Sequence, residues 1–250
     1  MRQLCVRLAC ALAVVASAAG AQPSTQWPIH SSDRPQPAVV DPGAGALPVP
    51  PPRDATILFG GTDLAKWAHT DGKPAGWIVR DGYFEVRPGM GNLRTRDSFG
   101  DAQLHVEWAS PSPAKGEGQD RGNSGVFLMG RYEVQVLDSY TNATYPDGQA
   151  GAVYGQFPPL VNASRAPGAW QSYDILFRGP RFDSSGRLLS PATMTVLHNG
   201  VLVQDHVTLS GPTAHHARPP YEAHPGKLPI LLQDHAHPVR FRNIWIRELR

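Results

Sequence analysis

The stretch Glu133-Val134-Gln135-Val136-Leu137-Asp138 decides how the middle of this chain folds. Val134 and Val136 alternate with Glu133 and Gln135, and successive side chains of a β-strand point to opposite faces of its sheet. The alternation predicts a strand that buries the two valines and presents Glu133 and Gln135 on its other face. Asp138 is an odd number of positions from Glu133, so it joins the same face only if a bulge inserts one extra residue.

The same period of two recurs along most of the chain. Short strand-like segments occur at residues 77–80, 83–86, 103–108, 126–129, 132–137, 173–178, 192–198, 201–203, 230–233 and 239–249. Asn199-Gly200 joins two of them, and both positions of such a hairpin turn need a positive φ. No segment has the pattern of a long amphipathic helix. Many short strands with tight turns predict an all-β fold, an antiparallel jelly-roll sandwich.

The first residues predict an export signal. Arg2 and Arg7 precede an apolar run, and small residues lead up to Ala21. This order is typical of a secretory signal peptide over residues 1–21, and the apolar run is shorter than the roughly 20 residues that span a bilayer. Both cysteines lie in this segment, so the rest of the chain has no disulfide. We expect a periplasmic or secreted protein without a membrane span.

Two further regions follow the predicted signal peptide. Residues 22–53 are rich in proline and lack apolar periodicity, which predicts an extended linker. Residues 54–250 have the length of one sandwich domain. Removing Arg2 and Arg7 from the 23 Lys and Arg residues leaves 21, which balances the 21 Asp and Glu residues. This neutral balance gives no electrostatic reason to expect nucleic acid or an anionic membrane as a partner.

Polar side chains on the predicted strands give candidates for a ligand-binding face. Each alternates with apolar neighbours, and together they are His105, Glu107, Glu133, Gln135, Gln233 and His235. The outer face of one sheet of such a sandwich often carries a long ligand. We therefore expect some of these side chains to meet on one open face.

Histidines in the last third of the chain are candidate metal ligands. His235-Ala236-His237 places two imidazoles on one predicted strand face, and His215-His216 and His224 lie in the preceding proline-rich loop. Imidazole and carboxylate groups are common ligands of divalent ions. The sequence leaves open whether a divalent ion is bound or the loop histidines are simply exposed, and it indicates no cofactor with certainty.

Several motifs together resemble one bacterial family. They are Leu58-Phe59-Gly60-Gly61-Thr62-Asp63-Leu64, Trp77-Ile78-Val79-Arg80-Asp81-Gly82, Gly122-Asn123-Ser124-Gly125, Gly151-Ala152-Val153-Tyr154-Gly155, Pro167-Gly168-Ala169-Trp170 and Leu232-Gln233-Asp234-His235. Over residues 57–249 their order and spacing resemble the 3-keto-disaccharide hydrolase domain family, formerly a domain of unknown function. The resemblance implies a concanavalin A-like jelly roll related to laminarinase-type and lichenase-type glucanases. It also implies activity on glycosides whose sugar is oxidised to a ketone at C3.

The resemblance gives the opening stretch a second meaning. Those glucanases carry a bulged Glu-x-Asp-x-x-Glu strand whose first Glu is the nucleophile and whose last is the acid/base. Glu133-x-Gln135-x-x-Asp138 is similar to it with two substitutions. Gln135 has no charge and Asp138 is one methylene shorter than Glu. Both differences count against a simple retaining mechanism, which needs carboxyl groups about 5–5.5 Å apart.

A ketone at C3 offers another route, because it acidifies the hydrogen on C2. A base can then remove this proton while donors stabilise the enolate and the aglycone leaves. The catalytic candidates are Glu133 or His235 as base, with Asp138 as a third. The substrate-binding candidates are Glu107, Asn123, Gln135 and Gln233, with Tyr154 and Trp170 as stacking platforms.

Two functions are open from the sequence. The first is an exported enzyme that cleaves 3-keto-glycosides by hydrolysis or by elimination. The second is a non-catalytic carbohydrate-binding protein on the same scaffold, since a fold does not fix a function. A carbohydrate is the expected partner in both. The aglycone, the anomeric preference and the oligomeric state do not follow from the sequence.

Overall fold

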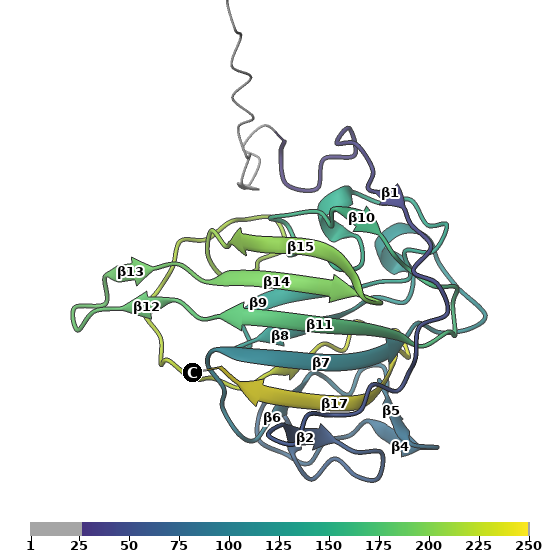
Figure 1. Ribbon diagram of the computed structural model, residues 1–250, viewed down its shortest axis with the longest axis horizontal. Helices are drawn as coiled ribbons and strands as arrows, with labels where there is room; N and C mark the ends of the chain where they lie inside the picture. The colour runs from purple at the N-terminus through teal and green to yellow at the C-terminus, as the bar shows by residue number, and fades with distance from the viewer. Residues whose placement is uncertain (1–26, 250) are drawn as a thin grey trace, which may run out of the picture.

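The computed structural model describes residues 27–249, so the predicted signal peptide lies outside the described residues. Two antiparallel sheets pack face to face (Figure 1). The eight-stranded sheet has the order β15-β14-β11-β7-β17-β5-β4, with β2 also paired to β17, and the five-stranded sheet has the order β3-β6-β16-β8-β9. Within residues 27–249 the only helices are two short 3-10 turns. The predicted all-β antiparallel jelly roll is confirmed.

Ten of the strands that the structure describes lie on the segments whose alternation predicted them, and β1, β2, β3, β6, β10, β12 and β13 were not predicted. The eight-stranded sheet contains β2 (Thr56–Phe59), β4 (Ile78–Arg80), β5 (Tyr83–Glu85), β7 (Ala102–Ala109), β11 (Gln171–Arg178), β14 (Thr193–His198), β15 (Val201–Thr208) and β17 (Arg240–Glu248). The five-stranded sheet contains β3 (Trp67–His69), β6 (Leu93–Thr95), β8 (Ser124–Leu128), β9 (Tyr132–Val136) and β16 (Leu231–Leu232). The remaining elements are β1 (Ala38–Val39), β10 (Val161–Asn162), β12 (Arg181–Phe182), β13 (Leu188–Ser190) and the 3-10 turns η1 (Gly118–Asp120) and η2 (Pro146–Gly148).

The inward faces of the two sheets form one hydrophobic core. Leu104, Val106 and Trp108 of β7 are fully buried in it, and so are Val134 and Val136 of β9. Burying one side chain of this kind contributes roughly 1.5–3 kcal/mol. The alternate positions of β9 therefore lie on the outer face of the five-stranded sheet, as the sequence predicts.

The proline-rich segment lies against the domain from Trp27 onward. β1 pairs in parallel with β10 through Ala38 and Val161. Further along, the backbone nitrogen of Val49 donates to Glu107 Oε1 at 2.9 Å, and Asn243 Nδ2 donates to the carbonyl of Val49 at 2.8 Å. Figure 1 shows the segment in purple along one edge of the molecule. Residues 27–53 contain turns and one short strand, and these contacts attach the segment to the domain.

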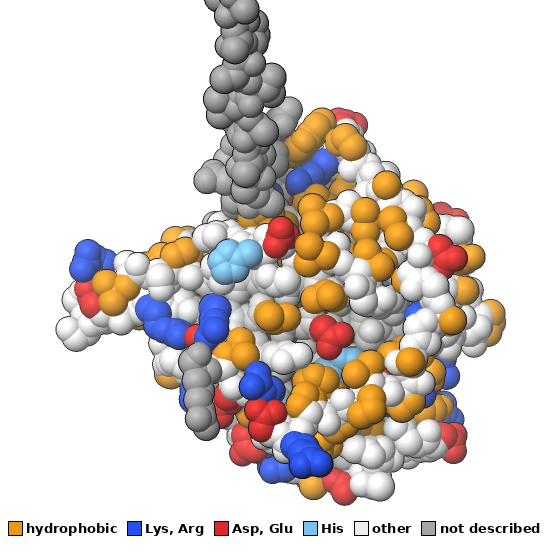
Figure 2. All heavy atoms as spheres, viewed as in Figure 1, with side chains coloured by type: hydrophobic (Ala, Val, Ile, Leu, Met, Phe, Trp, Pro, Cys, Tyr) orange, Lys and Arg blue, Asp and Glu red, His pale blue; other side chains and the backbone are white. Residues whose placement is uncertain are grey.

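The face that carries the eight-stranded sheet has a mixed surface. Figure 2 shows acidic and basic side chains interspersed along its edges, with hydrophobic groups scattered between them. No field of one sign covers this face, in agreement with the neutral charge balance. In the described part of the chain, no helix has the length and apolar character that a membrane span requires.

Candidate active site

A cavity of about 460 Å³ lies over the outer face of the five-stranded sheet. Strands β8 and β9 and the residues after β16 provide its floor, and loops provide its walls. The lining residues are Gln119, Asn123, Phe127, Glu133, Gln135, Tyr145, Tyr154, Thr213, Ala214, His215, Gln233 and His235. Small-molecule sites typically have volumes of roughly 300–1,000 Å³. The cavity therefore has room for a ligand of the size of a sugar.

Glu133 supplies the carboxyl group of this cavity. Among residues 27–249 it is the only Asp or Glu that lines the cavity, and its exposed fraction is 4%. Burial raises the pKa of Glu133 from its ordinary value of 4.5 to about 8. Its backbone nitrogen donates to Thr213 Oγ1 at 3.0 Å, which connects the strand to the wall of the cavity. A carboxyl group with this pKa exchanges a proton close to neutral pH.

Gly125 on the neighbouring strand makes room for the Glu133 side chain. A Cβ added at Gly125 would collide with Glu133 Oε1 and would lie 2.7 Å from Phe127 Cε2. Gln135, opposite Gly125 in the register, places its amide nitrogen 2.9 Å from Gln119 Oε1. With this amide turned over, the nitrogen lies 3.2 Å from Glu133 Oε1. The carboxyl group thus fills the space of an absent side chain and has an amide as its neighbour.

Amide side chains form much of the remaining polar lining. Asn123 Nδ2 donates to the carbonyl oxygen of Gln119 at 2.9 Å, and Gln119 Nε2 donates to the carbonyl of Gly148 at 2.9 Å. Gln233 is held by its backbone nitrogen, which donates to the carbonyl of Gly125 at 3.1 Å. Amides offer both donors and acceptors, which is what the hydroxyl and carbonyl groups of a sugar require.

Two tyrosines and His235 are further titratable groups in the lining of the cavity. The hydroxyls of Tyr145 and Tyr154 are 2.8 Å apart, and burial raises the pKa of both, so both keep their protons at neutral pH. His235 is exposed at the mouth of the cavity, with its ring 5.9 Å from that of His237. Partial desolvation, together with the nearby His237, lowers the pKa of His235. Its imidazole is therefore neutral at pH 7.

The structure places Asp138 outside this cavity. The pairing of β8 with β9 runs without a register shift from Ser124 and Val136 to Leu128 and Tyr132, and β9 ends before Asp138. The bulge that would bring Asp138 beside Glu133 is therefore absent from this pair.

Asp138 instead forms an ion pair within a neighbouring cavity. Arg121 Nε donates to Asp138 Oδ2 at 2.8 Å, and the backbone nitrogen of Tyr140 donates to Oδ1 at 3.2 Å. Burial raises the pKa of Asp138 against the lowering effect of Arg121. The prediction that Asp138 shares the site of Glu133 is corrected: its carboxylate stabilises the turn that leads into β8.

Glu107 also lies away from the cavity, beneath the proline-rich segment. It is fully buried and accepts hydrogen bonds from Arg242 Nε at 2.7 Å, from Asn243 Nδ2 at 2.8 Å and from the Val49 nitrogen. Burial alone would raise its pKa, but hydrogen bonds from His105, Asn243 and Arg242 lower the pKa of Glu107 to about 2. The predicted substrate-binding role is corrected, because residues 47–49 cover the face on which Glu107 lies.

Trp170 belongs to a third cavity, which the proline-rich segment lines in part through residues 41–47. Its ring is stacked by a guanidinium group, with Arg242 Cζ 4.2 Å from the ring centroid. Glu133, Asn123, Gln135, Tyr154, Gln233 and His235 are the predicted residues that the fold brings together. Glu107, Asp138 and Trp170 are the predicted residues that it places elsewhere.

Sequence patterns did not indicate three polar lining residues, Gln119, Tyr145 and Thr213. All three lie in loops or in a 3-10 turn, where no alternation marks the direction of a side chain.

The histidines considered as metal ligands separate into different places. His224 is 2.9 Å from the Tyr132 hydroxyl, and His237 Nε2 is 3.3 Å from Asp120 Oδ1. His215 and His216 remain together and meet His30 of the proline-rich segment. These three are the histidines that the described residues offer as a common ligand set.

An amide-rich cavity of this size on one sheet of a jelly roll is suited to a carbohydrate ligand, and family membership makes this a carbohydrate-active protein. The chain belongs to the 3-keto-alpha-glucoside-1,2-lyase-like domain family, whose model matches residues 54–247. The resemblance named from the sequence is thereby confirmed. A search of curated proteins found no match.

Solved structures agree with this assignment. One is a protein from Parabacteroides distasonis described as a "putative glycosyl hydrolase", which is 44% identical to this chain with a TM-score of 0.77. The match covers 82% of this chain and 94% of that protein. A second protein from the same organism, described in the same words, is 20% identical, with 79% and 94% covered and a TM-score of 0.58. The second likeness shows the fold alone.

Proposed function

We propose that this protein cleaves 3-keto-glucosides by removing the C2 proton and eliminating the C1 substituent. The observation that carries the proposal is Glu133, the only described carboxyl group that lines a sugar-sized cavity, with burial raising its pKa to about 8. A hydrolytic mechanism with two carboxylates needs a second group about 5–9.5 Å away, and Asp138 is engaged elsewhere by Arg121. The family description supports the same choice of reaction.

The elimination requires one base and a stabilised oxyanion. The carbonyl at C3 acidifies C2–H, the Glu133 carboxylate takes this proton, and the bonding electrons form the enolate. The enolate then returns its electrons to form the C1–C2 double bond while the bond from C1 to the glycosidic oxygen breaks. The aglycone leaves with those electrons and gains a proton, and an unsaturated 3-keto sugar remains.

Neutral donors around Glu133 suit two further roles, which are to stabilise the enolate oxygen and to give a proton to the departing glycosidic oxygen. Asn123, Gln135 and Gln233 supply amide N–H groups for the oxygen of the enolate. Tyr145 and Tyr154 keep their hydroxyl protons, which favours them as donors to the departing oxygen. His235 is neutral at pH 7 and is the alternative base. Substitution of Glu133 distinguishes the assignment of Glu133 as base from that of His235.

The test compares a 3-keto-glucoside with its unoxidised parent and follows both aglycone release and the ultraviolet absorbance of the conjugated enone. We expect release and absorbance from the keto sugar alone. Glu133→Gln should lower kcat by at least about 100-fold, the effect of losing a general base. Exposed Glu222 provides the matched control, and Glu222→Gln should act as the wild type. Full activity of Glu133→Gln would transfer the role of base to His235.

The amide-rich lining also favours a second candidate function, non-catalytic carbohydrate binding. Gln119, Asn123, Gln135 and Gln233 together can bind sugar hydroxyls without any chemical step. Sugar binding without release of the aglycone from either compound would support this reading and contradict the elimination. Export to the periplasm or beyond is part of both proposals and is argued from residues 1–21 alone.

A further inference from the structure

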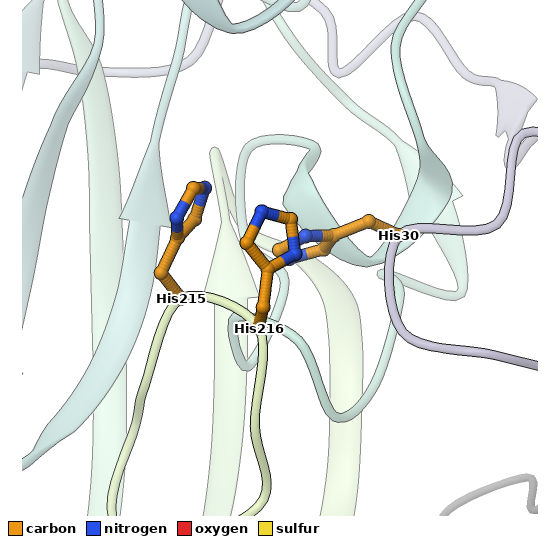
Figure 3. Close-up of side chains that lie close together, drawn as sticks. All are labelled: His30, His215 and His216. Carbon is orange, nitrogen blue, oxygen red and sulfur yellow. The ribbon is translucent and has the colours of Figure 1, made fainter.

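Three histidines from distant parts of the sequence meet at the rim of the cavity. His30 comes from the proline-rich segment, and His215 and His216 come from the loop that follows β15; Figure 3 shows the three side chains gathered together. The ring centroids of His215 and His216 are 3.9 Å apart, and that of His30 lies 5.6 Å and 5.0 Å from them. One ring nitrogen of each lies within 4.8 Å of the others.

His30 is the half-buried member of this cluster, and its two ring nitrogens are shielded from solvent and have no hydrogen-bond partner among the described residues. Its ring stacks on Tyr145, with centroids 4.0 Å apart, and its backbone nitrogen donates to Asp147 Oδ2 at 3.1 Å. An imidazole always carries at least one donor or acceptor that needs a partner, and leaving it unmet in a buried place is unfavourable. The contacts therefore hold the ring in position and leave its nitrogens available.

Burial and the charges around the cluster together shift the pKa of His30. Burial, opposed by Asp147 and assisted by His216, His215 and Arg218, lowers the pKa of His30 to about 4. An imidazole binds a metal ion through a ring nitrogen that carries no proton. Asp147 contributes a negative charge beside the cluster, and Arg218 a positive one.

We propose that His30, His215 and His216 bind one divalent transition-metal ion, with zinc as the expected ion. Three imidazole ligands favour zinc, copper or nickel over magnesium and calcium, which prefer oxygen ligands. Nitrogens bound to one tetrahedral zinc lie about 3.4 Å apart, given Zn–N bonds of roughly 2.0–2.1 Å. The ring nitrogens of the three histidines lie within 4.8 Å of one another, and rotation of the two exposed rings, His215 and His216, shortens these distances to the value that zinc requires.

The proposed ion joins the proline-rich segment to the cavity wall. His215 lines the cavity, and His30 stacks on Tyr145, which lines it too. Binding of the ion therefore fixes residues around His30 against the rim. This role is independent of which glycoside enters the cavity and of whether the bond is cleaved.

The first test measures zinc binding by calorimetry on protein purified without a polyhistidine tag and freed of metal with a chelator. We expect one zinc per chain. His30→Gln and His216→Gln should each weaken binding by at least about 100-fold, since loss of an outer-sphere partner alone costs roughly 10–100-fold. His206, exposed on β15 and outside the cluster, gives the matched control, and His206→Gln should bind as the wild type does.

A second readout follows the segment itself and does not depend on activity. Zinc should slow hydrogen exchange of residues 27–37 in the wild type and in His206→Gln, and should leave it unchanged in His30→Gln. Circular dichroism checks that every variant is folded. Absence of saturable binding at micromolar zinc, or equal binding in all variants, overturns the proposal, as does tighter binding of calcium than of zinc.

Discussion

Burial disfavours the charged form of the Glu133 carboxyl group. Its pKa of about 8 exceeds the ordinary 4.5, so between these pH values the folded protein holds a proton that the unfolded chain has lost. The wild type should therefore lose stability as pH rises from about 4.5 to about 8, by an amount on the order of a few kcal/mol. Glu133→Gln should remove this loss. Urea unfolding at pH 5, 7 and 9 measures it, and a parallel decline in both proteins would contradict the assignment.

Gly125 tests how closely the position of that carboxyl group is controlled. In Gly125→Ala the new methyl group would occupy the space of Glu133 Oε1, so the carboxyl group must move. A displacement of about 1 Å in a reacting group costs roughly 100-fold in rate, and we expect a loss of this size in kcat/KM. Gly226 has no atom within 4 Å of an added Cβ, so Gly226→Ala is the control. Equal turnover of the two variants would show that Glu133 tolerates the crowding.

At the same scale, alternation along β9 predicted which residues face the cavity. Glu133 and Gln135 lie on one face and Val134 on the other, because a strand without a bulge obeys the period of two throughout. The position of Asp138 depended on a bulge, and bulges follow from the local fit of two strands rather than from the residues of one. Its partner, Arg121, lies on a loop that no sequence pattern places.

Pairing between β7 and β17 brings Glu107 and Arg242 together directly across the two strands. The lowered pKa of Glu107, about 2 against an ordinary 4.5, means that its contribution is fully present above pH 4.5 and is lost as pH falls toward 2. Glu107→Gln should lower the free energy of unfolding at pH 7 by ~2–3 kcal/mol and should flatten this acid limb. Denaturant unfolding between pH 3 and pH 7 measures both effects, and an unchanged acid limb would show that Glu107 is not its source.

The turn between β14 and β15 is the element that sequence predicted in most detail. Asn199 and Gly200 have φ values of 53° and 82°, and they join the two strands as the hairpin pattern requires. β1 and β10 were not predicted, because two-residue strands carry too few side chains to show a period. Their partners lie more than a hundred residues apart, so no local signal specifies the pair.

The molecule as a whole includes the proline-rich segment as a structural part. Deleting residues 22–53 removes the pairing with β10, the Val49 contacts with Glu107 and Asn243, and the stacking of His30 on Tyr145. We expect the truncated domain to fold with a Tm lower by roughly 4–8 °C, equivalent to ~2 kcal/mol for a domain of this size. Calorimetry measures the change, and an unaltered Tm would mean that the segment only rests on the surface. Proline content and missing periodicity, from which a linker is predicted, say nothing about such contacts.

Floor and walls of the cavity have separate origins in the chain. The floor residues Glu133, Gln135 and Gly125 belong to paired strands whose opposite faces form the hydrophobic core, so most changes there disturb folding as well. The wall residues Tyr145, Thr213 and His215 lie on connecting segments, outside the strands that form the hydrophobic core. Substitutions in the walls therefore disturb folding less than substitutions in the floor do. Descendants of one ancestral gene can acquire new substrate ranges by drift in their loops and keep a single inherited chemistry.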